Sequence, residues 1–233
     1  MLKKEFNYMT ENRDFLIINK INIHFNDISY NLSFIENKES FSKNANLRKA
    51  ILFDFMQIGE LFNQLSPLFI QKFNNPNISR LISIRNRIVH GYASIIDDII
   101  YRTLTFDCPD FIKELNIFSR KLYLDEIKKF IGKKVKVTID RPLGSIHNGI
   151  TYNLNYGHIG ELVSLDGEYQ DAYILDEQRV MHSFEGFVIA IVHRINDIED
   201  KLIVSKELLE INKEQIEHQV DFQEKYFEHM ILY

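Results

Sequence analysis

The chain has 233 residues, of which 45% are hydrophobic and 12% are aromatic, enough to bury the core of one large domain or of two smaller ones. No segment approaches the roughly 18 consecutive apolar residues of a membrane span, and the start of the chain lacks the apolar core of a signal peptide. The single cysteine, Cys108, excludes an internal disulfide and a cysteine zinc cluster, so we expect a cytoplasmic globular protein with no membrane contact.

The net charge of −5 conceals two halves of opposite sign. Residues 1–123 carry 16 Lys and Arg against 13 Asp and Glu, whereas residues 124–233 carry 12 against 20. The basic half could contact a polyanion such as RNA, and the acidic half needs cations, either bound metal ions or solvent counterions. Charge alone does not decide between these partners and two ordinary solvated surfaces.

Apolar residues in the first half recur at helical spacing. In the range 46–64, steps of three and four residues place one apolar stripe on Leu47, Ile51, Phe55, Ile58 and Phe62. Similar spacing predicts further helices over 6–32, 78–89, 95–106 and 109–122, with breaks at 66–67, 74–76, 91 and 108–109. We therefore predict an all-α bundle of four or five helices for residues 1–123.

The apolar period changes to two from residue 133, where Val135, Val137 and Ile139 alternate with polar residues. Further β-like runs cover 149–156, 172–175, 185–194 and 201–204, and residues 206–229 return to helical spacing. Short strands separated by turn residues predict a small barrel or sandwich followed by a C-terminal helix. The expected fold class is α+β in two domains, 1–123 and 124–233.

A fixed cation and a titratable imidazole meet at the end of the predicted 78–89 helix. Arg85 and His90 lie little more than one turn apart, with Asn86 between them, and Gly91 ends the helix. Phosphodiester cleavage needs such groups, because His can move protons at the reacting oxygens and Arg can stabilise the charged transition state. Spacing alone favours a plainer interpretation, in which both side chains satisfy carbonyls at a helix C-terminus.

The wider pattern resembles the signature of HEPN toxins of the HepT branch. Arg85, Asn86, His90 and Tyr92 stand in the order Arg-Asn-x-x-x-His-x-Tyr, and the resemblance covers residues 12–122. It implies a helical bundle that forms a homodimer, in which two motifs build one metal-independent endoribonuclease cleft. There His90 would be the general acid or base, Arg85 would bind phosphate, and Asn86 would orient one of them. The resemblance also implies that a nucleotidyltransferase antitoxin adenylylates Tyr92 and so silences the toxin.

Carboxylates gather at two predicted turns of the second half. They are Asp166, Glu168 and Asp171 in the first turn, and Asp197, Glu199 and Asp200 before Lys201 in the second. Converging carboxylates repel one another unless a cation joins them, and Mg²⁺ binds carboxylate oxygens while bridging to phosphate. Acidic turns are also common as solvated surface, and composition alone favours that interpretation.

The context of these turns resembles the motifs of family I inorganic pyrophosphatases. Residues 152–159 are similar to their Tyr-Pro-x-Asn-Tyr-Gly-Tyr-Ile motif and 166–171 to Asp-Gly-Asp-Pro-x-Asp, within a shortened version of the family over 126–231. The resemblance implies an OB-like barrel that hydrolyses pyrophosphate with several Mg²⁺ ions. It assigns metal ligands to Asp166, Glu168, Asp171, Asp197 and Asp200, and phosphate contacts to Lys136, Tyr156, Lys201 and Tyr226.

Three departures from the pyrophosphatase pattern bear on activity. Glu168 stands where the family has Asp, and Phe227 stands where it has a phosphate-binding lysine. The segment that brings an arginine is mostly missing, which leaves Arg141 as its substitute. The loss of two cations would weaken both the binding of a tetra-anion and the stabilisation of its transition state.

Three functions remain open at this stage. The leading hypothesis is a toxin-type, HepT-like endoribonuclease with an appended domain that binds metal and a phosphorylated ligand. The alternative is a Mg²⁺-dependent inorganic pyrophosphatase or nucleotide pyrophosphohydrolase, with the helical half as dimeriser or sensor. The third is a regulatory binding protein without catalysis. RNA cleavage in EDTA supports the first, Mg²⁺-dependent phosphate release supports the second, and neither activity supports the third.

Overall fold

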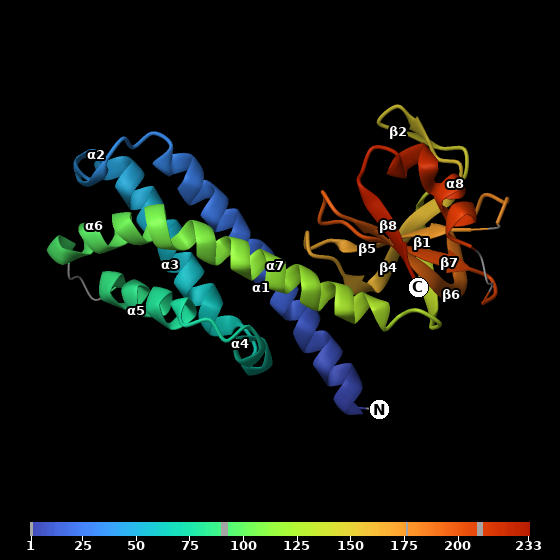
Figure 1. Cartoon of the computed structure of the whole chain (residues 1–233), viewed down its shortest axis with the longest axis horizontal. Coiled ribbons are helices and arrows are strands. Elements are labelled where there is room, and N and C mark those ends of the chain that lie inside the picture. The colour runs from blue at the N-terminus through green and yellow to red at the C-terminus, as the bar shows by residue number, and fades with distance from the viewer. Residues whose placement is uncertain (1, 90–92, 176, 209–211) are drawn as a thin grey trace. The chain divides into compact units, whose positions relative to one another are not determined.

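The computed structural model describes residues 2–89, 93–175, 177–208 and 212–233, with the side chains of 2–12 and 93–96 left out. The chain forms two compact units, Met1–Ser119 and Arg120–Tyr233. Helices build the first unit and a β-barrel dominates the second (Figure 1), so the expected α+β class is confirmed. No helix in the described ranges is long and apolar enough to cross a membrane.

The helical unit follows the predicted periodicity and adds two short helices. Its elements are α1 (Leu2–Leu32), α2 (Lys38–Lys43), α3 (Ala45–Gln64), α4 (Pro67–Phe73), α5 (Asn77–Val89), α6 (Ala93–Arg102), η1 (Thr103–Asp107) and α7 (Cys108–Lys128). Helix α3 packs between α1 and α5. Four residues of its predicted stripe, Ile51, Phe55, Ile58 and Phe62, are buried, whereas Leu47 is partly exposed at the end of the stripe.

The break expected at residues 108–109 is a widened helical turn. Pro109 has no N–H to donate, so the regular hydrogen-bond ladder cannot continue through it. The chain forms the π-helical turn η1 instead, in which the Cys108 N–H donates to the Thr103 carbonyl, and α7 then continues. Cys108 is buried beside this turn, and burial raises the pKa of its thiol to about 12. The thiolate that reactive cysteines need is therefore disfavoured.

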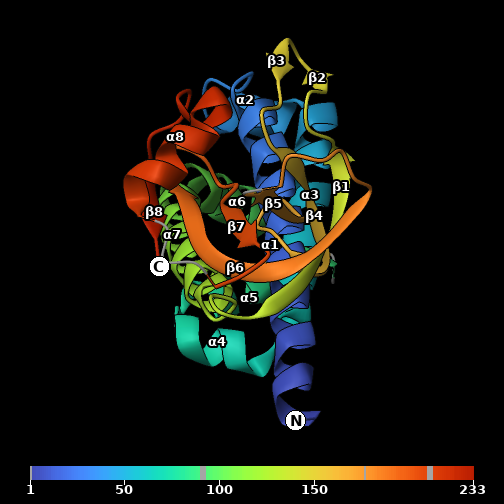
Figure 2. The same cartoon turned by 90° about the vertical axis from the view of Figure 1, so that its right-hand side faces the viewer.

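The second unit is a barrel closed by one strand that pairs on both sides. Its elements are β1 (Lys134–Arg141), β2 (Ile146–His147), β3 (Ile150–Thr151), β4 (Asn155–Val163), β5 (Tyr169–Ile174), β6 (Ser183–Arg194), β7 (Lys201–Ser205), α8 (Lys213–Glu224) and β8 (His229–Leu232). Strand β1 pairs with β4 and with β6, which closes the ring β1-β4-β5-β7-β6 (Figure 2). All pairs in the ring are antiparallel except β5 with β7.

The helix expected over 206–229 was wrong in extent. Helix α8 covers only Lys213–Glu224, and the chain then forms β8, which pairs with the end of β6. That partner lies far back in the sequence, so local periodicity could not predict the strand. The run expected over 149–156 was also misplaced, because it divides between the small β2–β3 hairpin and the start of β4.

Gly157 permits the close crossing of β1 and β4. It pairs with Ile139, and a Cβ atom at this position would overlap the carbonyl oxygen of Thr138. Gly160 lies on the same strand, but a Cβ atom there would meet nothing within 4 Å. Only the first of these glycines is required by the packing of the barrel.

We expect Gly157→Ala to lower the free energy of unfolding by about 2–3 kcal/mol, because the backbone of β1 must move to admit the methyl group. Gly160→Ala on the same strand is the control and should leave stability unchanged or raise it by about 0.5 kcal/mol. Urea unfolding followed by circular dichroism measures both. Equal stability of the two variants would contradict the close approach.

Candidate functional site

Arg85 is held near the end of α5 by two residues of α3 and by its neighbour. Its guanidinium donates to Glu60 Oε2 at 2.6 Å and to Asn86 Oδ1 at 3.0 Å. Its stem lies over Gly59, where a Cβ atom would come within 2.6 and 2.7 Å of Arg85 Cβ and Cγ. Gly59 and Glu60 therefore set the position of the arginine from another helix.

This arrangement leaves Arg85 able to meet an anion. Its side chain is 26% exposed, and its Nε atom is buried without a hydrogen-bond partner among the described residues. A phosphate would compete with Glu60, whose carboxylate is 45% exposed and can move aside. His90 and Tyr92 lie outside the described residues, so their assigned roles stay predictions.

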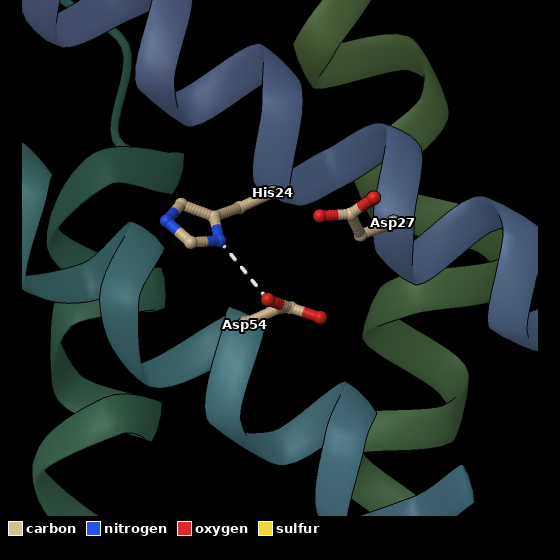
Figure 3. Close-up of side chains that lie close together, drawn as sticks. All are labelled: His24, Asp27 and Asp54. Atoms are coloured by element: carbon tan, nitrogen blue, oxygen red, sulfur yellow. Dashed lines mark hydrogen bonds and ion pairs between the residues drawn. The ribbon is translucent and has the colours of Figure 1, made fainter.

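A second polar cluster joins α1 to α3, and sequence reasoning missed it. His24 and Asp27 lie on one face of α1, and Asp54 of α3 approaches them (Figure 3). His24 Nδ1 and Asp54 Oδ1 are 3.0 Å apart, and one ligand atom from each of the three residues lies within 4.8 Å of the others. His24 and Asp54 already satisfy each other, so the observed contact is a polar tie between two helices, and a metal ion would have to break it.

The barrel contains a cavity of about 610 Å³ to which most of the residues assigned from the pyrophosphatase motifs contribute. The assigned residues that line it are Tyr156, Asp166, Glu168, Asp171, Asp197 and Lys201. The structure does not bring Lys136, Asp200 or Tyr226 to its wall. Lys136 and Tyr226 are exposed elsewhere, and Asp200 is buried beneath the cavity.

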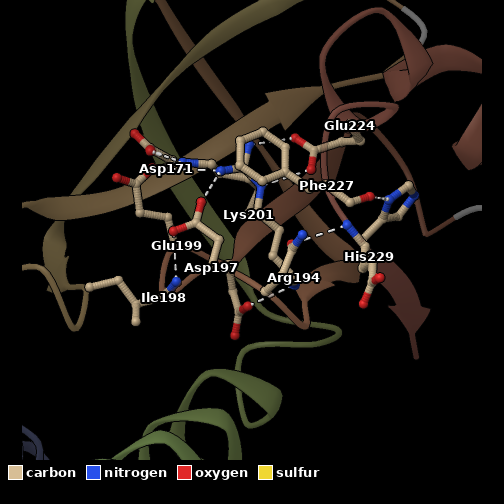
Figure 4. A network of polar contacts seen from close by, with 12 residues as sticks. Asp171, Arg194, Asp197, Ile198, Glu199, Lys201, Glu224, Phe227 and His229 are labelled. Carbon is tan, nitrogen blue, oxygen red and sulfur yellow. Dashed lines mark hydrogen bonds and ion pairs between the residues drawn. The ribbon is translucent and has the colours of Figure 1, made fainter.

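Neighbouring side chains before β7 point to opposite sides. Lys201 is bonded to Asp171 and, at 2.8 Å, to Glu199 in the cavity wall (Figure 4). Asp200 faces the interior instead, where it accepts from Arg120 at 2.7 Å. Sequence reasoning chose Asp200 and passed over Glu199. The alternation of side chains along an extended chain was the available signal, because it places Glu199 and Lys201 on one face.

Arg194 forms the floor of the cavity as a buried cation. Glu224 receives two hydrogen bonds from its guanidinium, each 2.8 Å long, and Asp197 receives a third at 2.7 Å. The guanidinium also lies 3.5 Å from the centre of the Phe227 ring (Figure 4). Burial opposes the charged form, but the bonds to Glu224 outweigh it and raise the pKa of Arg194. Phe227, which stands in place of a lysine, thus covers a cation supplied by β6.

Arg141 is the permanent cation of the cavity wall that pairs with no carboxylate in the described part of the chain. It donates to the hydroxyl of Tyr152 and lies 4.9 Å from the ring centre of Tyr156. Burial raises the pKa of Tyr156, so this hydroxyl stays neutral. Arg141 is therefore placed to bind an anionic group of a ligand.

The cavity carries an excess of negative charge. Six carboxylates and three permanent cations line it, a net of −3 with neutral histidines. Asp166 is half-buried, and its burial raises the pKa of its carboxyl group. A polyanionic ligand would be repelled unless divalent cations entered with it. The carboxylates are spread more widely than a tight three-ligand cluster, which suits Mg²⁺ because this ion keeps several of its waters.

The helical unit resembles a known ribonuclease family. Residues 27–117 match the family described as Ribonuclease HepT-like. The resemblance inferred from the motif at Arg85 is thereby confirmed. Comparison with curated protein sequences gave no match.

The solved structures similar to this chain are inorganic pyrophosphatases. The enzyme from Ehrlichia chaffeensis is 12% identical with a TM-score of 0.36, over 42% of this chain and 84% of that one. The Helicobacter pylori enzyme is 15% identical with a TM-score of 0.33, over 40% and 75%. The Neisseria gonorrhoeae enzyme is 19% identical with a TM-score of 0.33, over 41% and 74%.

We expect Glu224→Gln to destabilise the protein by about 3 kcal/mol, because it removes the charge that compensates a buried guanidinium. Glu217→Gln on the same helix is the control, since Glu217 pairs with Lys213 at the surface and should contribute less than about 0.5 kcal/mol. Thermal and urea unfolding compare the two variants. A similar, small effect of both would show that Arg194 does not depend on Glu224.

Proposed function

We propose that this protein is a HepT-like endoribonuclease that cleaves RNA without a metal ion and carries a second domain that binds a phosphorylated ligand. The match of residues 27–117 to the ribonuclease family supports the proposal. The observation that carries it is the geometry of Arg85, which Glu60 and Asn86 hold near the end of α5 with part of its guanidinium exposed.

In the proposed reaction, the 2′-hydroxyl of RNA attacks the adjacent phosphorus, and the 5′-oxygen of the next nucleotide leaves. One His90 accepts the proton of the attacking hydroxyl, and a second His90 donates a proton to the leaving oxygen. Arg85 neutralises the charge that develops on the non-bridging oxygens, and Asn86 holds the guanidinium. Because each chain has one such motif, the cleft is proposed to form between two copies in a homodimer.

Control of this cleft is proposed to act through Tyr92, two residues beyond His90. Adenylylation of its hydroxyl by a nucleotidyltransferase antitoxin would add a bulky anion beside the RNA path. That anion would compete with the substrate phosphate for Arg85.

We expect Arg85→Ala and His90→Ala each to reduce RNA cleavage at least 100-fold, because each removes a group that acts only in the transition state. Arg87→Ala is the control, since Arg87 is an exposed arginine of the same helical turn. Cleavage of a labelled RNA by the full chain in EDTA measures all three. A strict requirement for Mg²⁺, or full activity in both motif variants, would contradict the proposal.

A second candidate function is favoured by the cavity of the barrel, which we propose binds a diphosphate together with Mg²⁺. Arg141 would contact the phosphate directly, and Lys201 would reach it from between Asp171 and Glu199. Asp166, Glu168 and Asp171 would offer oxygens to the metal. Bound Mg²⁺ would neutralise the excess negative charge and polarise the phosphate oxygens. Hydrolysis of the bound diphosphate is the activity that this candidate adds.

We expect Asp166→Asn to weaken binding of Mg²⁺-pyrophosphate at least tenfold, whereas Asp221→Asn, an exposed site on α8 outside the cavity, should have no effect. Only the ionised carboxylate binds metal, and the pKa of Asp166 is raised. Affinity should therefore fall on acidification at a higher pH than an ordinary aspartate would give. Calorimetric titration measures both effects, and released phosphate distinguishes turnover from binding. Equal affinities of the two variants would contradict the assignment.

A further inference from the structure

The barrel cavity is larger than a diphosphate requires. Its volume of about 610 Å³ falls in the range of roughly 300–1,000 Å³ that is usual for organic ligands. Its phosphate-binding groups, Arg141 and Lys201, occupy only part of the wall. The rest of the wall therefore faces some other portion of the ligand.

Two aromatic rings form an ordered ledge in that remaining wall. The rings of His158 and Tyr169 are stacked, with centres 5.2 Å apart and planes inclined by 14°. His158 is held in place by Asp140, whose Oδ2 lies 2.6 Å from the ring Nδ1. Tyr169 is 52% exposed although it lines the cavity, so part of its ring is accessible to a ligand.

Strand register sets the distance from this ledge to the phosphate-binding groups. His158 pairs with Asp171 across β4 and β5, and Tyr169 lies two residues before Asp171 on the same face of β5. Two strand residues span about 7 Å. Asp171 contacts Lys201, so an aromatic surface begins about 7 Å from the groups that would hold phosphate and metal.

The chemistry of the wall thus changes from one end to the other. One end offers cations and carboxylates, which suit a phosphate chain with Mg²⁺, and the other offers stacked rings, which suit a planar base. A ribose is the natural spacer between such groups in a nucleotide. Inorganic pyrophosphate would leave the aromatic end without a contact.

We propose that the cavity binds a nucleoside diphosphate or triphosphate with Mg²⁺, with its base stacked on Tyr169 and its phosphates at Arg141 and Lys201. This inference rests on the proposed phosphate-binding function of the barrel and names its ligand class. His158 is a positioning residue in this site, because it supports the tyrosine ring from the side.

The test compares ADP with inorganic pyrophosphate, each with Mg²⁺, by calorimetric titration of the full chain. We expect Tyr169→Ala to weaken ADP binding about tenfold or more, because base stacking is lost, and to leave pyrophosphate binding within twofold. Tyr169→Phe keeps the aromatic ring and should retain the affinity for ADP. Tyr226→Ala is the control, since Tyr226 is similarly exposed but lies outside the cavity.

The outcomes separate this inference from the function on which it rests. Pyrophosphate binding in the wild type, with ADP binding no tighter and insensitive to Tyr169→Ala, would overturn the nucleotide site and leave the phosphate site standing. An equal loss for both ligands in Tyr169→Ala would also overturn it. Binding of neither ligand by the wild type would overturn both proposals.

Discussion

The barrel depends on the compensation of one buried charge, the guanidinium of Arg194. Its side chain is 1% exposed, and Glu224, its principal partner, is completely buried. Because an uncompensated charge in such a place is very unfavourable, the end of β6 and the last turn of α8 must stay together. Glu224 also accepts a hydrogen bond from Tyr173 of β5 at 2.6 Å, so the same carboxylate connects a helix to two strands. The floor of the cavity is thus built from charges that the fold itself requires.

This explains why the cavity resembles a metal-phosphate site yet differs in its electrostatics. Two carboxylates of its wall, Asp171 and Glu199, are bonded to Lys201, and Asp197 is bonded to Arg194, so protein cations already lie among them. Arg141 keeps its charge for a ligand. The ribonuclease motif solves a related problem differently, because Arg85 is held by one partly exposed carboxylate that a phosphate can displace. A cation that supports a fold is paired permanently, whereas a cation that binds substrate is paired weakly.

The sequence predicted the order of the elements better than their ends, and the position of the sites better than their contacts. Periodicity located α3 and β1 because each buries one face locally, but β8 depends on a partner in β6 and had no local signal. The motifs led to Asp166 and Asp171 in the cavity wall, whereas Asp200 pairs with Arg120, a residue from an α-helix that no motif included. The role of Gly59 beneath Arg85 was equally hidden, since the packing of two helices brings them together.

The π-helical turn at Thr103–Asp107 has a consequence for how this chain tolerates changes in length. A π turn holds one residue more than the α-helical turn it replaces, and each residue of an α-helix turns the chain by about 100°. Removing one residue here would rotate the following helix by that angle and carry its buried side chains, Phe111 and Leu115, out of the core. The extra residue therefore acts as a register key: the segment between α6 and α7 can change in identity more freely than in number.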